Sequence, residues 1–248
     1  MEISSNIVDA HCHIHEFPNE EIKDIGKLVT YLIAVSDDHR SSIRTLDLAK
    51  RYRWIIPSVG LHPWSVDADS IDEAKKISDL AREKGNEIRI LGEVGLDKRF
   101  KQDTYHHQLK VFEIFIELAK EMNMILNIHA AGAWREVLNI LAKNDIPMAI
   151  IHWYTGPLEL IKEINDRGYL ITVNPTIAIQ QKQRDVIAQA PIDLILVESD
   201  APYKYKGLEL HPKHIPNVIK HIAMIKKISE EEVHEAISRN IYKLLKHI

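Results

Sequence analysis

Short apolar, β-branched segments alternate with longer segments of helical period along the chain, and this alternation limits the possible folds more than any other feature. Such alternation is typical of βα units, whose strands lie parallel in one sheet. Helices are expected over residues 105–122 and after Ser229, which forms a capping-box pattern with Glu232. The segments expected to be strands are residues 7–10, 30–36, 54–60, 88–92, 124–129, 148–152, 169–174 and 194–198.

Eight strands with seven intervening helices in 248 residues fit the usual size of a (β/α)8 barrel, the TIM barrel of the α/β class. The nearly continuous apolar run at residues 146–151 is expected in a parallel sheet that is covered on both faces. We find no linker, low-complexity segment or repeat of identical residues, so residues 1–248 are expected to form a single domain. A doubly wound open sheet is the alternative, although no G-x-G-x-x-G motif follows the first strand.

Composition excludes several classes of protein. A net charge of -4, from 32 Lys and Arg against 36 Asp and Glu, differs from that of a strongly basic nucleic-acid coat protein. No apolar run approaches the roughly 20 residues that span a bilayer, and no signal peptide is visible. The single cysteine, Cys12, fits a reducing compartment and is expected to be a small packing residue. We therefore expect a cytoplasmic protein without a membrane association or an obligate protein partner.

Residues that can bind metals stand at the ends of most predicted strands. In a barrel the carboxyl ends of all strands meet at one mouth, where barrel active sites lie. Buried histidines and acids are costly unless they are paired or metal-bound, so six of them at one end of the sheet indicate a metal centre. These six are His11 and His13 after the first strand, Glu93 after the fourth, His129 and His152 at the ends of the fifth and sixth, and Asp200 after the eighth.

The spacing of His11 and His13 has a direct meaning. Side chains alternate faces along a strand, so these two histidines point the same way and can clamp one ion, while Cys12 points away. Four imidazoles and two carboxylates exceed what one tetrahedral zinc needs. They suffice for two divalent ions bridged by a carboxylate, a role expected for Glu93, and two ions about 3.5–4 Å apart polarise a phosphoryl oxygen and activate water.

Taken in chain order, these motifs resemble the TatD family of metal-dependent hydrolases, within the amidohydrolase-like superfamily, over nearly the whole chain. The matching pieces are Asp-Ala-His-Cys-His at residues 9–13, Gly-Leu-His-Pro at 60–63, Gly-Glu-Val-Gly-Leu-Asp at 92–97, His129, His152, and Glu-Ser-Asp-Ala-Pro-Tyr at 198–203. The resemblance implies a hydrolase that depends on divalent zinc, magnesium or manganese ions, and many family members are described as deoxyribonucleases.

The resemblance also implies roles for individual residues. Asp200 is the expected general base that orients the attacking water, Glu93 is the second residue expected to act in catalysis, and His62 and Tyr203 match positions near the substrate. The implied metal ligands are His11, His13, Glu93, His129, His152 and Asp200.

Three departures from the family pattern fall at positions that hold substrate rather than metal. They are Ala-Ala-Gly at residues 130–132 after His129, Lys98 where an aromatic residue is common, and Glu-Leu-His-Pro at 209–212. We expect cleavage of phosphodiester bonds, with DNA or a small phosphate ester as the substrate. The alternatives are the same barrel acting on a small phosphate ester, a lactone or an amide, and a catalytically idle barrel that serves as a binding module.

Several other residues near the predicted mouth have two interpretations. Trp64 and Trp153 follow site residues closely and either stack on a nucleobase or line the barrel mouth. His211 and His214 lie three residues apart beside prolines, and the sequence leaves open whether they contact substrate.

Overall fold

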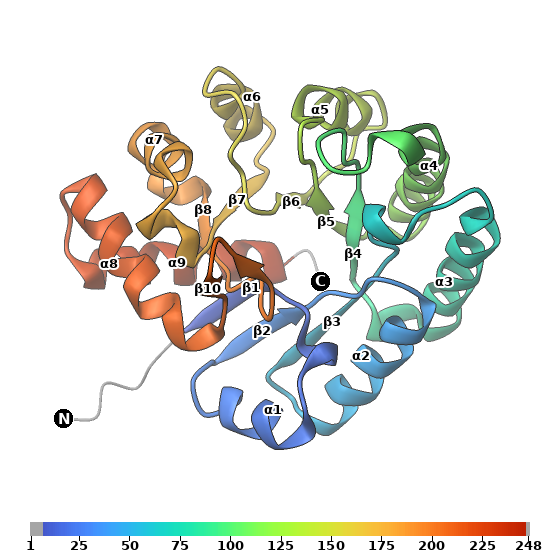
Figure 1. The fold of residues 1–248 in the computed structure, drawn as a ribbon, viewed down its shortest axis with the longest axis horizontal. Helices are drawn as coiled ribbons and strands as arrows, with labels where there is room; N and C mark the ends of the chain where they lie inside the picture. The colour runs from blue at the N-terminus through green and yellow to red at the C-terminus, as the bar shows by residue number, and fades with distance from the viewer. Residues whose placement is uncertain (1–6, 247–248) are drawn as a thin grey trace.

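The computed structural model of the chain describes residues 7–246, and Figure 1 shows helices arranged around a central set of strands. All eight expected strands are present, and they form one sheet in which each strand pairs in parallel with the next along the chain. The strands are β1 (Val8–Cys12), β2 (Tyr31–Ala34), β3 (Ile55–Val59), β4 (Ile90–Gly95), β5 (Ile125–His129), β6 (Ala149–Ile151), β7 (Leu170–Val173) and β8 (Ile195–Val197).

The first and last strands meet at their carboxyl ends. The backbone N–H of Asp200 donates a hydrogen bond to the carbonyl of His11 at 2.9 Å, and the N–H of His13 donates to the carbonyl of Ala201 at 2.9 Å. A doubly wound sheet reverses its strand order and leaves two separated edges, whereas this sheet keeps sequence order and its ends come together. The expected (β/α)8 barrel is confirmed.

Helices connect the strands and cover the outside of the barrel (Figure 1). The helix expected over residues 105–122 is confirmed with the same bounds, and it ends where Asn123 takes a left-handed conformation with φ of 51°. The helices are α1 (Asn19–Ile25), α2 (His39–Arg51), α3 (Ser70–Lys84), α4 (Tyr105–Met122), α5 (Trp134–Lys143), α6 (Leu160–Asp166), α7 (Gln181–Gln189), α8 (Ile215–Lys226) and α9 (Glu230–Leu245).

The capping box before α9 is also confirmed. The Ser229 hydroxyl accepts a hydrogen bond from the Glu232 N–H, and the Glu232 carboxylate accepts one from the Ser229 N–H at 2.7 Å. Each bond satisfies a backbone donor that the first turn of a helix leaves without a partner.

The strands are buried on both faces, as the apolar runs predicted. Every residue of β1, β4, β6, β7 and β8 is buried, and Cys12 packs in the core as expected. Burying one isoleucine or leucine side chain stabilises a fold by about 1.5–3 kcal/mol. The apolar side chains of these strands therefore contribute most of the stability of the barrel.

Two strands extend further than predicted. β1 reaches Cys12 and β4 reaches Gly95, so His11 and Glu93 lie inside strands rather than in the loops after them. The sequence analysis ended both strands too early because a polar side chain after an apolar run is usually taken as the start of a loop. In this barrel those polar side chains point into the mouth while the backbone continues its pairing.

A short hairpin of β9 (Lys204–Tyr205) and β10 (Leu208–Glu209) follows the eighth strand and was not predicted. Within residues 7–246, no helix combines the length and the apolar character that crossing a membrane requires.

Candidate metal centre

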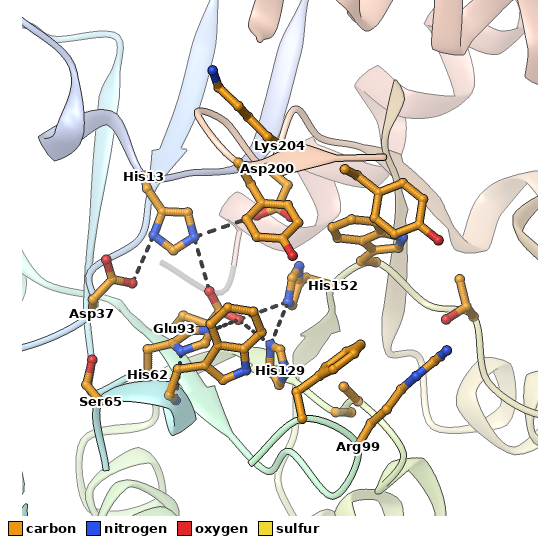
Figure 2. A pocket seen from close by; sticks show the side chains of 18 of the residues that line it. His13, Asp37, His62, Ser65, Glu93, Arg99, His129, His152, Asp200 and Lys204 are labelled. Atoms are coloured by element: carbon orange, nitrogen blue, oxygen red, sulfur yellow. Dashed lines mark hydrogen bonds and ion pairs between the residues drawn. The ribbon is translucent and has the colours of Figure 1, made fainter. Parts of the chain in front are cut away.

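Glu93 lies at the centre of the barrel mouth, and its two carboxylate oxygens face two different groups of histidines (Figure 2). Its Oε2 atom lies 3.1 Å from His11 Nε2 and 3.3 Å from His13 Nε2. Both histidines come from β1 or the residue directly after it, and both point to the same side, as their spacing predicted.

The other oxygen of Glu93 faces histidines from the third, fifth and sixth strand ends. Oε1 lies 2.8 Å from His129 Nδ1, 2.9 Å from His152 Nε2 and 3.1 Å from His62 Nε2. The ring nitrogens His129 Nδ1 and His152 Nε2 are themselves only 3.3 Å apart. Glu93 thus has a set of nitrogen atoms on each side, which is the arrangement of a bridging carboxylate.

Asp200 completes the group beside His11 and His13. Its Oδ1 atom lies 3.6 Å from the Nε2 atom of each histidine. Asp200 has φ of 53°, a left-handed conformation that aspartate tolerates better than most residues. That backbone conformation accompanies the hydrogen bond from its N–H to the His11 carbonyl, which holds the residue beside β1.

A close backbone contact between β3 and β4 supports this geometry. A Cβ atom on Gly60 would lie 2.5 Å from the carbonyl oxygen of Glu93, so only glycine lets the end of β3 pass so near this residue. The chain then leads directly to His62 and into the mouth.

Each of the four histidines that the sequence proposed as ligands has an oxygen of another side chain near its outer ring nitrogen. Such outer contacts fix the tautomer and orientation of metal-binding histidines. The pairs are His11 Nδ1 with Asn127 Oδ1 at 2.9 Å, His13 Nδ1 with Asp37 Oδ1 at 3.0 Å, His129 Nε2 with Asp97 Oδ2 at 3.0 Å, and His152 Nδ1 with Glu198 Oε1 at 3.7 Å.

The contacts of His11 test whether a cation fits between the histidines and Glu93. The Asn127 amide NH2 donates to the Ala10 carbonyl at 2.9 Å, so its oxygen faces His11 and must accept from His11 Nδ1–H. The other ring nitrogen, Nε2, therefore faces the Glu93 carboxylate, 3.1 Å away. An imidazole nitrogen and a carboxylate oxygen that face each other are a donor pair that a divalent metal ion accepts.

His62 differs from these four histidines. Its Nδ1 atom accepts a hydrogen bond from the Trp64 N–H at 2.9 Å, so its proton lies on Nε2 and is donated to Glu93 Oε1. Burial lowers the pKa of His62. The contact is complete without a cation, which distinguishes a hydrogen-bond donor from a metal ligand.

Neighbouring charges shift the pKa values of the ionisable groups in the site. Burial alone raises the pKa of Glu93, but the attraction of His62, His152 and His11 outweighs it and holds that pKa well below its usual value. Burial lowers the pKa of His13, while Asp37 and Asp200 reverse the effect and raise it well above the usual value. A metal ion that binds these histidines would therefore have to compete with protons.

The metal-capable residues open into a cavity of about 550 Å³. Its wall includes aromatic rings from several loops, in edge-to-face contact at centroid distances of 5.4–6.2 Å. Tyr203 is 41% exposed and Phe100 is 62% exposed, so their rings are available to a bound molecule. The rings of this aromatic wall are Trp64, Phe100, Trp153, Tyr203 and Tyr205.

The sequence departures have different places around this cavity. Ala130 and Ala131 line it, and the hairpin that follows the eighth strand contributes Lys204 and Tyr205. Lys98 is not among the lining residues and instead pairs with Glu136 of α5. His211 and His214 do not line it either, and His211 faces Glu21 at 3.5 Å.

The sequence analysis assigned no role to the outer partners Asp37, Asp97, Asn127 and Glu198. Asp37 comes shortly after the second strand, so the strand-end rule that located the histidines also covers this residue. Asn127 is two residues before His129 on β5, and alternation places both on the inner face. Their pairing with particular histidines depends on the barrel's cross-strand register, which the sequence does not display.

Comparisons with known proteins show which family this chain and its barrel resemble. The family described as TatD related DNase matches residues 8–246. An uncharacterised metal-dependent hydrolase of Methanocaldococcus jannaschii is 32% identical over 246 residues, covering 96% of each chain. The human deoxyribonuclease TATDN3 is 28% identical, covering 98% of this chain and 96% of its own. The crystal structure of YjjV, a TatD homologue from Escherichia coli, superposes with a TM-score of 0.88 at 24% identity, covering 98% of each chain.

Proposed function

Because the chain belongs to the TatD-related DNase family of metal-dependent hydrolases, we propose that it cleaves phosphodiester bonds in DNA with two divalent ions at Glu93. The proposal rests chiefly on one observation, the separation of the two oxygens of Glu93 between two groups of histidines. Human TATDN3 is named a deoxyribonuclease, which supports DNA as the substrate.

We assign the proposed ligands to the two ions as follows. Glu93 would bridge both, with His11, His13 and Asp200 on its Oε2 side, and His129 and His152 on its Oε1 side. This donor set of imidazoles and carboxylates suits zinc and manganese, and its carboxylates also suit magnesium. When bound, such ions polarise a phosphoryl oxygen and lower the pKa of water.

Asp200 is the proposed general base. The oxygen of a water molecule forms a bond to phosphorus, and one proton of that water passes to the Asp200 carboxylate. The bond between phosphorus and the leaving oxygen breaks, and this oxygen keeps the electron pair and takes up a proton from solvent. The left-handed backbone of Asp200 and its hydrogen bond to His11 keep the carboxylate beside the histidines while it accepts the proton.

The cavity wall supplies the proposed substrate contacts. His62 has its Nε2–H fixed on Glu93 and stands between this carboxylate and Trp64, with which its ring is in edge-to-face contact. Tyr203 and Trp153 contact each other at a centroid distance of 5.9 Å and offer faces on which bases stack. Arg99 also lines the cavity, and its guanidinium carries the positive charge that a phosphate needs.

A substrate panel tests this function. The metal-free protein is reloaded with Mn²⁺, Mg²⁺ or Zn²⁺ and assayed on end-labelled single-stranded DNA, small phosphate esters, lactones and amides. We expect metal-dependent shortening of the DNA and no hydrolysis by the chelated protein. Faster turnover of a small phosphate ester, a lactone or an amide than of DNA would contradict the proposed substrate, and no turnover of any compound by metal-loaded protein would favour an idle barrel.

A further inference from the structure

A second group of metal-capable side chains lies beside the site just described. His13, His15, Glu16 and Asp37 each place one nitrogen or oxygen atom within 4.8 Å of the others. Three of these residues, His15, Glu16 and Asp37, are outside the proposed ligand set. Glu16 and Asp37 line the same cavity as Glu93, so this group belongs to the wall of the mouth rather than to a remote surface.

Asp37 connects the two groups. Its Oδ1 atom lies 3.0 Å from His13 Nδ1, and its Oδ2 atom lies 3.1 Å from His15 Nε2. Figure 2 shows Asp37 on one side of the His13 ring, with Glu93 and Asp200 on the other. One carboxylate oxygen therefore orients His13, and the second oxygen is directed to His15.

The His15 ring is held in a ligand-like orientation. Its Nδ1 atom lies 3.2 Å from the Val35 carbonyl, which can only accept a hydrogen bond, so Nδ1 carries a proton. The Nε2 atom of His15 then faces a carboxylate oxygen of Asp37 at 3.1 Å. The His15 side chain is only 9% exposed, so water screens this contact poorly, and a cation that binds both atoms would be strongly attracted to the carboxylate.

Glu16 supplies a third donor on the solvent side. Its side chain is exposed and makes no hydrogen bond or ion pair within residues 7–246, so its carboxylate is free to turn toward His15 and Asp37. One imidazole nitrogen and two carboxylates form a donor set that Mn²⁺ and Zn²⁺ accept, with the remaining coordination positions open to the cavity.

We propose that His15 Nε2, Asp37 Oδ2 and the Glu16 carboxylate form a third divalent-cation site on the cavity wall. The site is weaker than the central pair because it has three protein ligands and one of them is an exposed side chain that must become ordered. An ion there adds positive charge beside the place where an anionic substrate enters. The inference does not depend on the proposed phosphodiesterase reaction.

Counting bound ions tests the third site. Metal-free full-length protein is dialysed to equilibrium against increasing Mn²⁺, and the ions per chain are measured by atomic emission for wild type, His15→Gln and Glu16→Ala. We expect both variants to saturate with one Mn²⁺ per chain fewer than wild type, and the ion that they lose to be the last that wild type binds. Glu20→Ala, an exposed glutamate a few residues away, is the matched control and should saturate like wild type.

Equal saturation of wild type and both variants would overturn the third site, because a proton rather than a metal ion would then lie between His15 and Asp37. If His15→Gln does not fold, Glu16→Ala still decides the question, since Glu16 is exposed. A wild type that cleaves DNA but never binds the extra ion contradicts this inference alone. A wild type that binds the extra ion but hydrolyses no phosphodiester contradicts the proposed function alone.

Discussion

At the scale of single residues, Glu93 organises the site because five histidines lie within 3.3 Å of its two oxygens. The carboxylate is almost fully buried, so these contacts act in a medium that screens charge weakly. Asp200 has a different place, at 3.6 Å from His11 and His13 and with its backbone in a left-handed conformation. Separate positions fit separate roles, a bridge for Glu93 and a base for Asp200.

Replacing Asp200 tests its role as base. Asp200→Asn keeps the shape and one oxygen but removes the basicity, so we expect turnover of the metal-loaded enzyme to fall by roughly 10²–10⁴-fold. The melting temperature and binding of at least one ion should persist. Rates near wild type on every substrate of the panel would show that another group accepts the proton.

Asp97 provides a test of the outer partners. It accepts hydrogen bonds from His129 Nε2 at 3.0 Å and from Trp64 Nε1 at 2.6 Å, and the attraction of these groups overcomes its burial and holds its pKa at about 2. We expect Asp97→Asn to weaken Mn²⁺ binding by roughly 10–100-fold, as loss of such contacts commonly does. Calorimetric titration measures the change.

Asp103→Asn is the matched control for this experiment. Asp103 lies a few residues further along the chain, is exposed, and makes no side-chain hydrogen bond or ion pair among the described residues. Its substitution should leave Mn²⁺ affinity unchanged. Equal affinities for Asp97→Asn and wild type would remove Asp97 from the metal centre.

Residue types and their positions in the chain were enough to select the histidines and acids that meet at the mouth. The contacts that separate the proposed metal ligands from a hydrogen-bond donor were not predictable. His62 and His129 both approach Glu93, but only the Trp64 N–H on His62 Nδ1 and the Asp97 carboxylate on His129 Nε2 distinguish them. Such contacts depend on side-chain rotamers and loop shape, which a sequence without its fold does not specify.

At the scale of elements, the strands position the site through their alternation and their shared direction. β1 and β4 extend past the predicted ends, and this extension holds His11 and Glu93 on rigid backbone. The helix over residues 105–122 was predictable to the residue because a long periodic segment ends at Asn123, whereas the β9–β10 hairpin was not. Its strands have only two residues each, too few for a periodicity to appear.

The capping box of α9 gives a stability test at this scale. Ser229→Ala removes the hydroxyl that accepts from the Glu232 N–H, so we expect the free energy of unfolding to fall by about 1 kcal/mol. Urea denaturation measures this loss. No residue of α9 lines the cavity, so Mn²⁺ binding should match wild type. An unchanged free energy would show that the cap does not stabilise α9.

At the scale of the whole molecule, closure of the barrel brings the first and last strands together and thereby places Asp200 beside His11 and His13. Nearly two hundred residues separate Asp200 from this pair in the chain. The order of strands made the fold class predictable, and the closed sheet then fixed the neighbours of each strand end. The distances between side chains at the mouth could not be predicted, because they depend on the register of every strand pair.

Metal and pH act together on the stability of the fold. In chelated protein the pKa values of His13 and His152 lie well above the unfolded value of about 6.5. The stability that they contribute is therefore complete below pH of about 6.5 and is lost as pH rises toward their folded pKa values. Under the proposed function, Mn²⁺ would replace these protons on binding and would stabilise only the folded state.

We therefore expect the melting temperature of chelated protein to fall as pH rises above about 6.5, and the increase caused by Mn²⁺ to grow over the same range. Differential scanning calorimetry with and without chelator measures both trends. An increase caused by Mn²⁺ that shrinks with rising pH would contradict competition between protons and metal at these histidines.

The central claim is that Glu93 bridges two divalent ions, and the anomalous scattering of Mn²⁺-loaded crystals tests it most directly. The account predicts one peak within about 2.0–2.2 Å of each Glu93 oxygen. The first lies beside His11, His13 and Asp200, and the second lies beside His129 and His152. The absence of a peak beside either oxygen of Glu93 would contradict the account, whatever other peaks the crystals show.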